Sequence, residues 1–182
     1  YCRQIGRLAF PIFAFLTVQG YQHTSKLEKY IGNLFIFALI SEVPFDLAFY
    51  DTSYYGGHMN IFFTLALGII GLALYENFEE KNQLVPQLLT LVLTGRIAEI
   101  LRVDFGFYGV ELIMCLGILR NNKTTQTVFG VIMGLLQTPA ASLAFFPITL
   151  YNGERGRQNK WFFYIFYPAH LLVFYLIRTL FF

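Results

Sequence analysis

The amino-acid sequence predicts an all-α fold, a polytopic transmembrane bundle of about seven helices. Hydrophobic residues make up 56% of the 182 residues and aromatic residues 19%, whereas charged residues make up only 13%. Soluble domains carry about 25% charged residues, so this composition is typical of a protein that faces lipid. Successive apolar stretches also approach the length of about 20 residues that a membrane-spanning helix needs.

Seven stretches are expected to form the helices. They are residues 5–22, 30–50, 59–76, 84–102, 106–120, 126–151 and 160–182. The fifth stretch is short for a full span, so a buried or tilted helix is the alternative there. The connecting segments are short and polar, and backbone polar groups in lipid must be satisfied within helices. We therefore expect a single transmembrane domain over residues 1–182, truncated at its N-terminus because the chain starts at Tyr1.

Charge and metal-binding residues narrow the possible partners. The net charge of +2 is too small to argue for nucleic acid. Cys2 and Cys115 are single and far apart, so they offer neither a disulfide framework nor a CxxC metal site. The three histidines show no regular spacing, and we therefore assign no metal. The expected surrounding is membrane lipid.

Charged side chains lie inside several of the expected spans. Such charges are costly in lipid and usually mark a functional or internally paired site. Four are acidic and two are basic, which leaves two carboxylates in excess. Protonation, solvent exposure or a cation from outside, such as an amine substrate, would resolve this excess. The six residues are Arg7, Glu42, Asp46, Arg96, Glu99 and Glu111.

The segment SEVPFD at 41–46 is the clearest of these sites. Glu42 and Asp46 are four residues apart and share one helix face. Pro44 lies between them and is expected to kink or end the helix. One interpretation is a carboxylate pair that faces a polar cavity. The other is a helix end near the membrane surface, with Asp46 exposed.

The two basic residues have different expected roles. Pro11 frees the backbone carbonyl of Arg7, and the Arg7 guanidinium could pair with a carboxylate of the second span or bind an anionic ligand. Arg96 and Glu99 have helical i, i+3 spacing, so we expect them to neutralise each other as a structural pair.

The last apolar stretch contains WFFYIFYPAHLLVFYLIR, with a proline and a histidine near its middle. Pro168 frees the carbonyl of Tyr164 and is expected to bend this helix beside His170. A neutral imidazole there could accept a proton from a nucleophile, or it could bond to a neighbouring helix for packing. The preceding LYNGERG, 150–156, is either a basic loop at the lipid headgroups or a phosphate contact for a nucleotide-like donor.

The whole chain resembles the TraX family, membrane proteins linked to N-terminal acetylation of conjugative pilin. The resemblance rests on GRLAFPIFAF and GYQHT, FALISEVPFDLAFY, NIFFTLALG, DFGFYGV, LYNGERG and FFYIFYPAHLLVFYLI, in this order. It implies a multi-pass protein of the bacterial inner membrane that transfers acetyl from acetyl-CoA to an amine such as a pilin N-terminus. The family pattern has a further helix with an Asp-His pair before GRLAFP, which this sequence does not include.

Polar positions within the matching motifs become the candidate site. We expect His170 to be the catalytic base or to orient one, and Glu42 or Asp46 to hold the ammonium group before deprotonation or to polarise a histidine. Two other classes remain open, a proton-coupled transporter and a membrane protein that assists pilus assembly without chemistry. The remaining candidates are Arg7, Asn152 and Arg155 for the donor, and Asn60 for the substrate.

Overall fold

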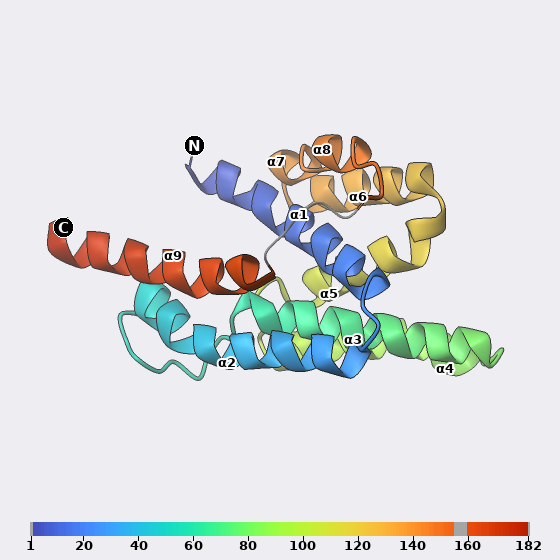
Figure 1. The fold of residues 1–182 in the computed structure, drawn as a ribbon, viewed down its shortest axis with the longest axis horizontal. Helices are drawn as coiled ribbons and strands as arrows, with labels where there is room; N and C mark the ends of the chain where they lie inside the picture. Colours follow the sequence, from blue (N-terminus) through green and yellow to red (C-terminus); the bar gives the residue numbers. More distant parts are fainter. Residues whose placement is uncertain (1, 155–159, 182) are drawn as a thin grey trace.

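A computed structural model describes residues 2–154 and 160–181 (Figure 1). Within these ranges, the regular elements are helices, and the only strand-like pairing is an isolated bridge between Met59 and Val103. The helices are α1 Cys2–Gln22, α2 Leu27–Tyr50, α3 Ile61–Glu80, α4 Leu84–Ile100, α5 Gly106–Ile118, a short 3-10 turn Leu119–Asn121, α6 Lys123–Gln137, α7 Pro139–Ser142, α8 Phe145–Thr149 and α9 Lys160–Phe181.

The predicted all-α membrane fold is confirmed, and the seven expected stretches each contain a helix. Three helices, α2, α3 and α9, are long and apolar enough to cross a membrane. The fifth stretch is the short α5, whose buried side chains include Leu112 and Met114 at 0% exposure. The alternative of a buried helix at this position is therefore confirmed.

The sixth expected stretch, 126–151, is not one continuous helix. α6 ends at Gln137 because Thr138 has an extended backbone and Pro139 starts the next helix. The Thr138 hydroxyl accepts a hydrogen bond from the backbone N–H of Ala141, at 3.3 Å, which caps α7. The chain then folds back on itself as α7 and α8.

The helices pack around α3. This helix contacts α2, α4 and α5, while α1 lies against α5 and α7, and α9 lies against α2. In Figure 1, α2, α3 and α4 run along the long axis of the molecule, with α1 and α6–α8 above them. Small residues allow the close approach of α3 and α5: a Cβ at Gly68 would lie 2.8 Å from side-chain atoms of Ile113.

Of the two outcomes expected at Pro44, a kink or an end of the helix, the end is wrong, because α2 continues to Tyr50. α9 holds the last turn of α2 in place. The Arg178 guanidinium donates to the carbonyl oxygens of Ala48, at 3.0 Å, and Leu47, at 3.2 Å, and pairs with Asp51. Carbonyls at the C-terminus of a helix favour such a cation. α9 is likewise helical through Pro168.

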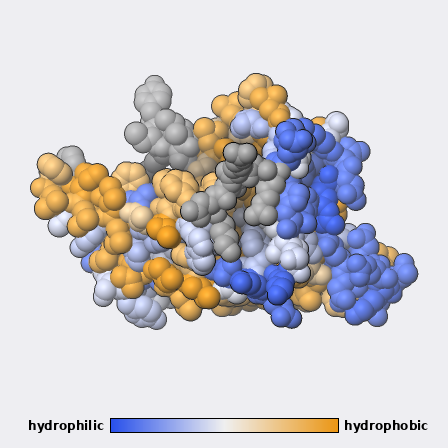
Figure 2. Space-filling view, in the orientation of Figure 1, coloured by the Kyte–Doolittle hydropathy of each residue, from blue (hydrophilic) through white to orange (hydrophobic). Residues whose placement is uncertain are grey.

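The surface separates into apolar and polar regions. Figure 2 shows a hydrophobic covering over α9, whereas hydrophilic residues gather around the turn between α3 and α4 and the start of α6. Exposed Phe162, Ile165 and Phe174 contribute to the apolar surface of α9. An apolar surface of this kind is what lipid contact requires.

Candidate functional site

A partly buried polar cluster lies where α2 ends, α3 begins and α4 connects to α5. We call it the acidic–histidine cluster and define it as Glu42, Asp46, His58, Asn60 and Asp104. Glu42 and Asp46 belong to α2. His58 and Asn60 lie in the segment that leads into α3, and Asp104 lies in the loop before α5. None of these five residues belongs to the last helix, α9.

The two carboxylates of α2 face inward. Asp46 is only 2% exposed, and its Oδ2 accepts a hydrogen bond from the backbone N–H of Tyr55 at 2.7 Å. The buried oxygens Asp46 Oδ1 and Glu42 Oε2 have no hydrogen-bond partner among the described residues. Of the two interpretations of SEVPFD, an exposed Asp46 at a helix end is therefore wrong, and an inward carboxylate pair fits.

Backbone pairing brings His58 to Asp104. The N–H of Met59 donates to the carbonyl of Arg102 at 3.0 Å, and the N–H of Asp104 donates back to the carbonyl of Met59 at 2.8 Å. His58 acts electrostatically on both Asp104 and Glu42. Burial raises the pKa of the Asp104 carboxyl, and the neighbouring His58 opposes that rise.

Asn60 ties the cluster together. Its side-chain oxygen caps α3 by accepting from the N–H of Phe62 at 3.0 Å, and its amide nitrogen donates to the carbonyl of Ala38 in α2 at 2.7 Å. Asn60 is completely buried, and it also lies next to the Glu42 carboxylate. Asn60 thus fixes α2 against α3 next to the carboxylates.

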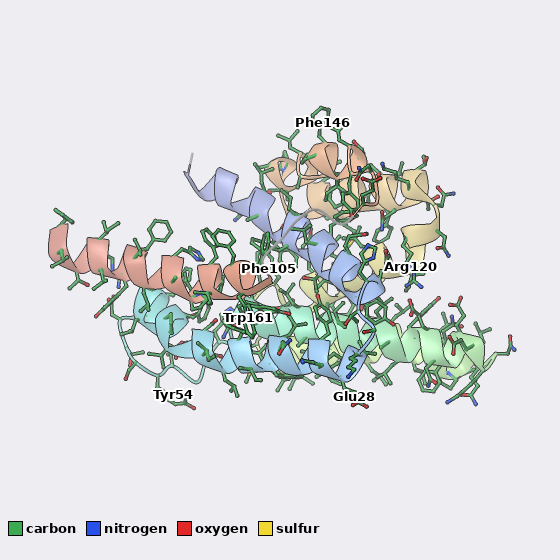
Figure 3. The ribbon with its side chains drawn as sticks, viewed as in Figure 1. Glu28, Tyr54, Phe105, Arg120, Phe146 and Trp161 are labelled. Atoms are coloured by element: carbon green, nitrogen blue, oxygen red, sulfur yellow. The ribbon has the colours of Figure 1, made fainter. Side chains whose placement is uncertain are left out.

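A cavity of about 790 Å³ lies beside this cluster, between α1, α2, α3 and α9. At one end its lining contains His23, Lys26 and Lys29, at the turn from α1 to α2. At the other end the lining is aromatic, and Phe105 is stacked on Phe10 with ring centroids 3.8 Å apart. Figure 3 shows Phe105 near the centre of the molecule, by the start of α9.

Tyr167 connects the cavity with the cluster. It lines the cavity, and its hydroxyl lies against the backbone of Ile61 at the start of α3. The same hydroxyl interacts electrostatically with Asp104 and Glu42. Tyr167 and Ile61 therefore border both the cavity and the cluster.

His170 lies one turn further along α9 and also lines the cavity. Its Nδ1 is 2.9 Å from the carbonyl oxygen of Phe166 in its own helix. The imidazole ring stacks on Phe166, and its edge-on neighbours are Tyr167 and Phe174. The structure thus places His170 at the cavity in an aromatic setting, whereas its predicted partners Glu42 and Asp46 are not among the residues that line the cavity.

The predicted donor contacts are dispersed. Arg7 is exposed, and no ion pair joins it to Glu42 or Asp46 in the described part of the chain, so that expected pairing is wrong. Asn152 is exposed and accepts a hydrogen bond from the N–H of Glu154 at 3.0 Å, within its own turn. Arg155 lies outside the described residues.

Other charges of the spans form local pairs. Arg96 and Glu99 bond to each other at 2.9 Å, as expected, on the exposed side of α4. Arg120 pairs with Glu76, which also accepts a hydrogen bond from the hydroxyl of Tyr21 at 2.7 Å. The first pair lies within α4, whereas the contacts of Glu76 join α3 to Arg120 and to α1; none involves a residue of the acidic–histidine cluster, and we assign them a structural role.

Sequence reasoning missed His58, Asp104 and Tyr167. A usable signal was present for the first two: in a bundle of alternating helices, the 51–60 and 101–105 connections belong to the same end. Carboxylate and imidazole groups in both connections are then neighbours. Tyr167 carries no such signal, because tyrosine is common in this apolar stretch.

The fold and the site together define a polytopic membrane protein with a partly buried acidic–histidine cluster beside a cavity. The chain belongs to the TraX family, because the family model described as "TraX protein" matches residues 1–178. It is also similar to "Probable fimbrial assembly protein FimC, serogroup H1" of Dichelobacter nodosus, with 27% identity over 198 residues, covering 93% of this chain and 79% of that protein. No solved structure matches the chain.

Proposed function

We propose that the protein is an acetyltransferase of the bacterial inner membrane, which moves acetyl from acetyl-CoA to an amine such as a pilin N-terminus. Membership of the TraX family supports this proposal. The Dichelobacter relative is named as a fimbrial assembly protein, which supports an acceptor related to fimbriae.

The cavity is the observation that carries the proposal. Its lining follows α1 from Ala9 to His23, a distance of about 21 Å at the helical rise per residue. Lys26 and Lys29 at one end supply positive charge for the phosphates of an acyl-CoA. The aromatic end would receive the apolar arm and its thioester, next to Tyr167.

The carboxylates supply the complementary half of the reaction. An amine arrives as a cation, and Glu42 and Asp46 present buried oxygens that can hold it. The amine nitrogen then attacks the thioester carbonyl, so that a C–N bond forms and the C–S bond breaks. His170, on the cavity wall, is placed to orient the donor or to assist proton movement.

A second candidate function is assembly of a surface filament without chemistry. The name of the Dichelobacter relative, a fimbrial assembly protein, favours this second function. In that case the protein would bind a subunit of the filament, and acetyl-CoA would have no effect on it.

The test uses purified protein in lipid nanodiscs with acetyl-labelled acetyl-CoA and a peptide that has a free N-terminus. We expect label on the peptide, and a reduced rate at limiting acetyl-CoA for the double variant Lys26→Gln, Lys29→Gln. Lys81→Gln, a lysine at the turn after α3 and outside the cavity lining, is the matched control and should retain the rate. No label above the protein-free background would refute the proposed function.

A further inference from the structure

The acidic–histidine cluster contains buried polar atoms that nothing in the described chain satisfies. They are Glu42 Oε2, Asp46 Oδ1 and His58 Nδ1. Leaving a buried polar atom without a partner destabilises a fold. Asp46 is 2% exposed, so solvent does not replace the missing partner. Two anionic acceptors and one imidazole nitrogen in one buried place match the hydrogen-bonding groups of a primary amine.

We propose that His58 accepts the proton of the acceptor amine, in a site where Glu42 and Asp46 hold that amine. This inference rests on the proposed acetyl transfer and gives it an acceptor site on the α3 side of the donor cavity. It assigns the base to the connection between α2 and α3, and leaves to His170 a position along the donor.

The charge that the base acquires favours His58. An imidazole that takes a proton becomes a cation, and nearby carboxylates stabilise a cation. His58 interacts electrostatically with Glu42 and Asp104. His170, by contrast, has aromatic ring neighbours, and its Nδ1 faces the carbonyl of Phe166.

The position of His58 is fixed by its neighbours in the chain. Residues on either side are held by the Met59 bridge to Val103 and by the hydrogen bond from Tyr55 N–H to Asp46. Phe45 of α2 meets the His58 ring edge-on, with ring centroids 6.3 Å apart. An imidazole anchored in this way needs little rearrangement before it accepts a proton.

Several titratable groups face this site and would influence its pH dependence. Asp46 and Glu42 come from α2, Asp104 from the loop before α5, and Tyr167 from α9. Tyr50, at the end of α2, also interacts with Asp46 and Asp104, and it stacks on Tyr55 with ring centroids 3.9 Å apart.

The ammonium gives one proton to solvent as it leaves solvent for the site. The neutral nitrogen then attacks the thioester carbonyl carbon that reaches the wall at Tyr167, and as the C–N bond forms it gives its second proton to His58 Nδ1. The C–S bond breaks, and the imidazolium returns this proton to the departing thiolate. The products are the amide and the free thiol of CoA.

The experiment compares His58→Ala with His170→Ala in the nanodisc transfer assay, with bound acetyl-CoA and melting temperature measured in parallel. We expect His58→Ala to lose about 100-fold or more in kcat, to keep acetyl-CoA binding, and to regain activity when imidazole is added. His170→Ala should lose less activity, and its loss should come from a changed KM for acetyl-CoA.

The conservative variant His58→Gln covers the case in which His58→Ala fails to fold. His58→Gln should show the same loss in kcat while it keeps acetyl-CoA binding. A folded His58 variant that keeps the wild-type rate would overturn the inference while the acetyl transfer stands. Absence of transfer by the wild-type protein would instead refute the proposed function.

Discussion

The backbone N–H of Asp104 donates a hydrogen bond to the carbonyl of Met59, with 2.8 Å between nitrogen and oxygen. This contact joins the connection that precedes α3 to the connection that precedes α5. It places His58 beside Asp104, and the cap of α3 at Asn60 follows directly. Two polar loops thereby become one buried site next to the carboxylates of α2.

Replacement of Asn60 by alanine should destabilise the protein. Asn60→Ala removes the cap of α3, which is worth about 1 kcal/mol, and leaves the buried carbonyl of Ala38 without its donor, which adds about 1–3 kcal/mol. Thermal unfolding in a fixed detergent measures the loss.

Asn122 provides the matched control for this change. It caps α6 by accepting from the N–H of Thr125 at 3.1 Å, in an exposed position. Asn122→Ala should therefore cost only the cap, about 1 kcal/mol or less. Equal losses in the two variants would contradict the role of Asn60 as a tie between α2 and α3.

The close packing of α3 on α5 predicts a strong effect at Gly68. A Cβ there would meet Ile113 at 2.8 Å, so Gly68→Ala should cost about 1–3 kcal/mol through overpacking. Gly32→Ala in α2 has no atom within 4 Å of its new Cβ and should be neutral or stabilising by up to about 1 kcal/mol. The melting temperature of Gly68→Ala should therefore be clearly lower than that of Gly32→Ala. A Gly68→Ala protein as stable as Gly32→Ala would contradict the observed packing.

The burial of Asp104 leads us to expect that the stability of the fold depends on pH. Burial raises its folded-state pKa above the unfolded value of about 3.9, so the folded protein binds the proton more tightly. The stabilising contribution of this group is therefore full below about pH 4 and is lost as pH rises through the folded pKa.

Asp104→Asn should remove this dependence, because the amide does not ionise. The stability of wild type relative to the variant should fall as pH increases from about 4 upward, measured as the difference in unfolding midpoint. A difference that is constant with pH would show that Asp104 does not titrate with folding.

Some of the site follows directly from local sequence spacing. Glu42 and Asp46 share a helix face at i, i+4, and both face inward, while Arg96 and Glu99 at i, i+3 form the expected pair. Such relations depend only on the helical repeat. The break of the sixth stretch was also readable, since Thr138 and Pro139 are a cap followed by a first-turn proline.

The remaining features depend on contacts between distant segments. The bridge of Met59 to Val103 joins two loops and carries no local pattern, which is why His58 and Asp104 escaped prediction. For Arg7, pairing with a carboxylate of the second span was one of two expectations, beside binding of an anionic ligand. α1 instead lies against α5 and α7, and the Arg7 side chain is exposed.

The central claim is that the carboxylates of α2 receive an amine that becomes acetylated. The most direct measurement is mass spectrometry of a pilin-type peptide after incubation with acetyl-CoA and the protein, with the N-terminally blocked peptide as control. We predict one added acetyl group on the free α-amine, none on the blocked peptide, and a raised KM for the peptide in Asp46→Asn. An unmodified free peptide, or equal modification with and without the protein, would contradict the claim.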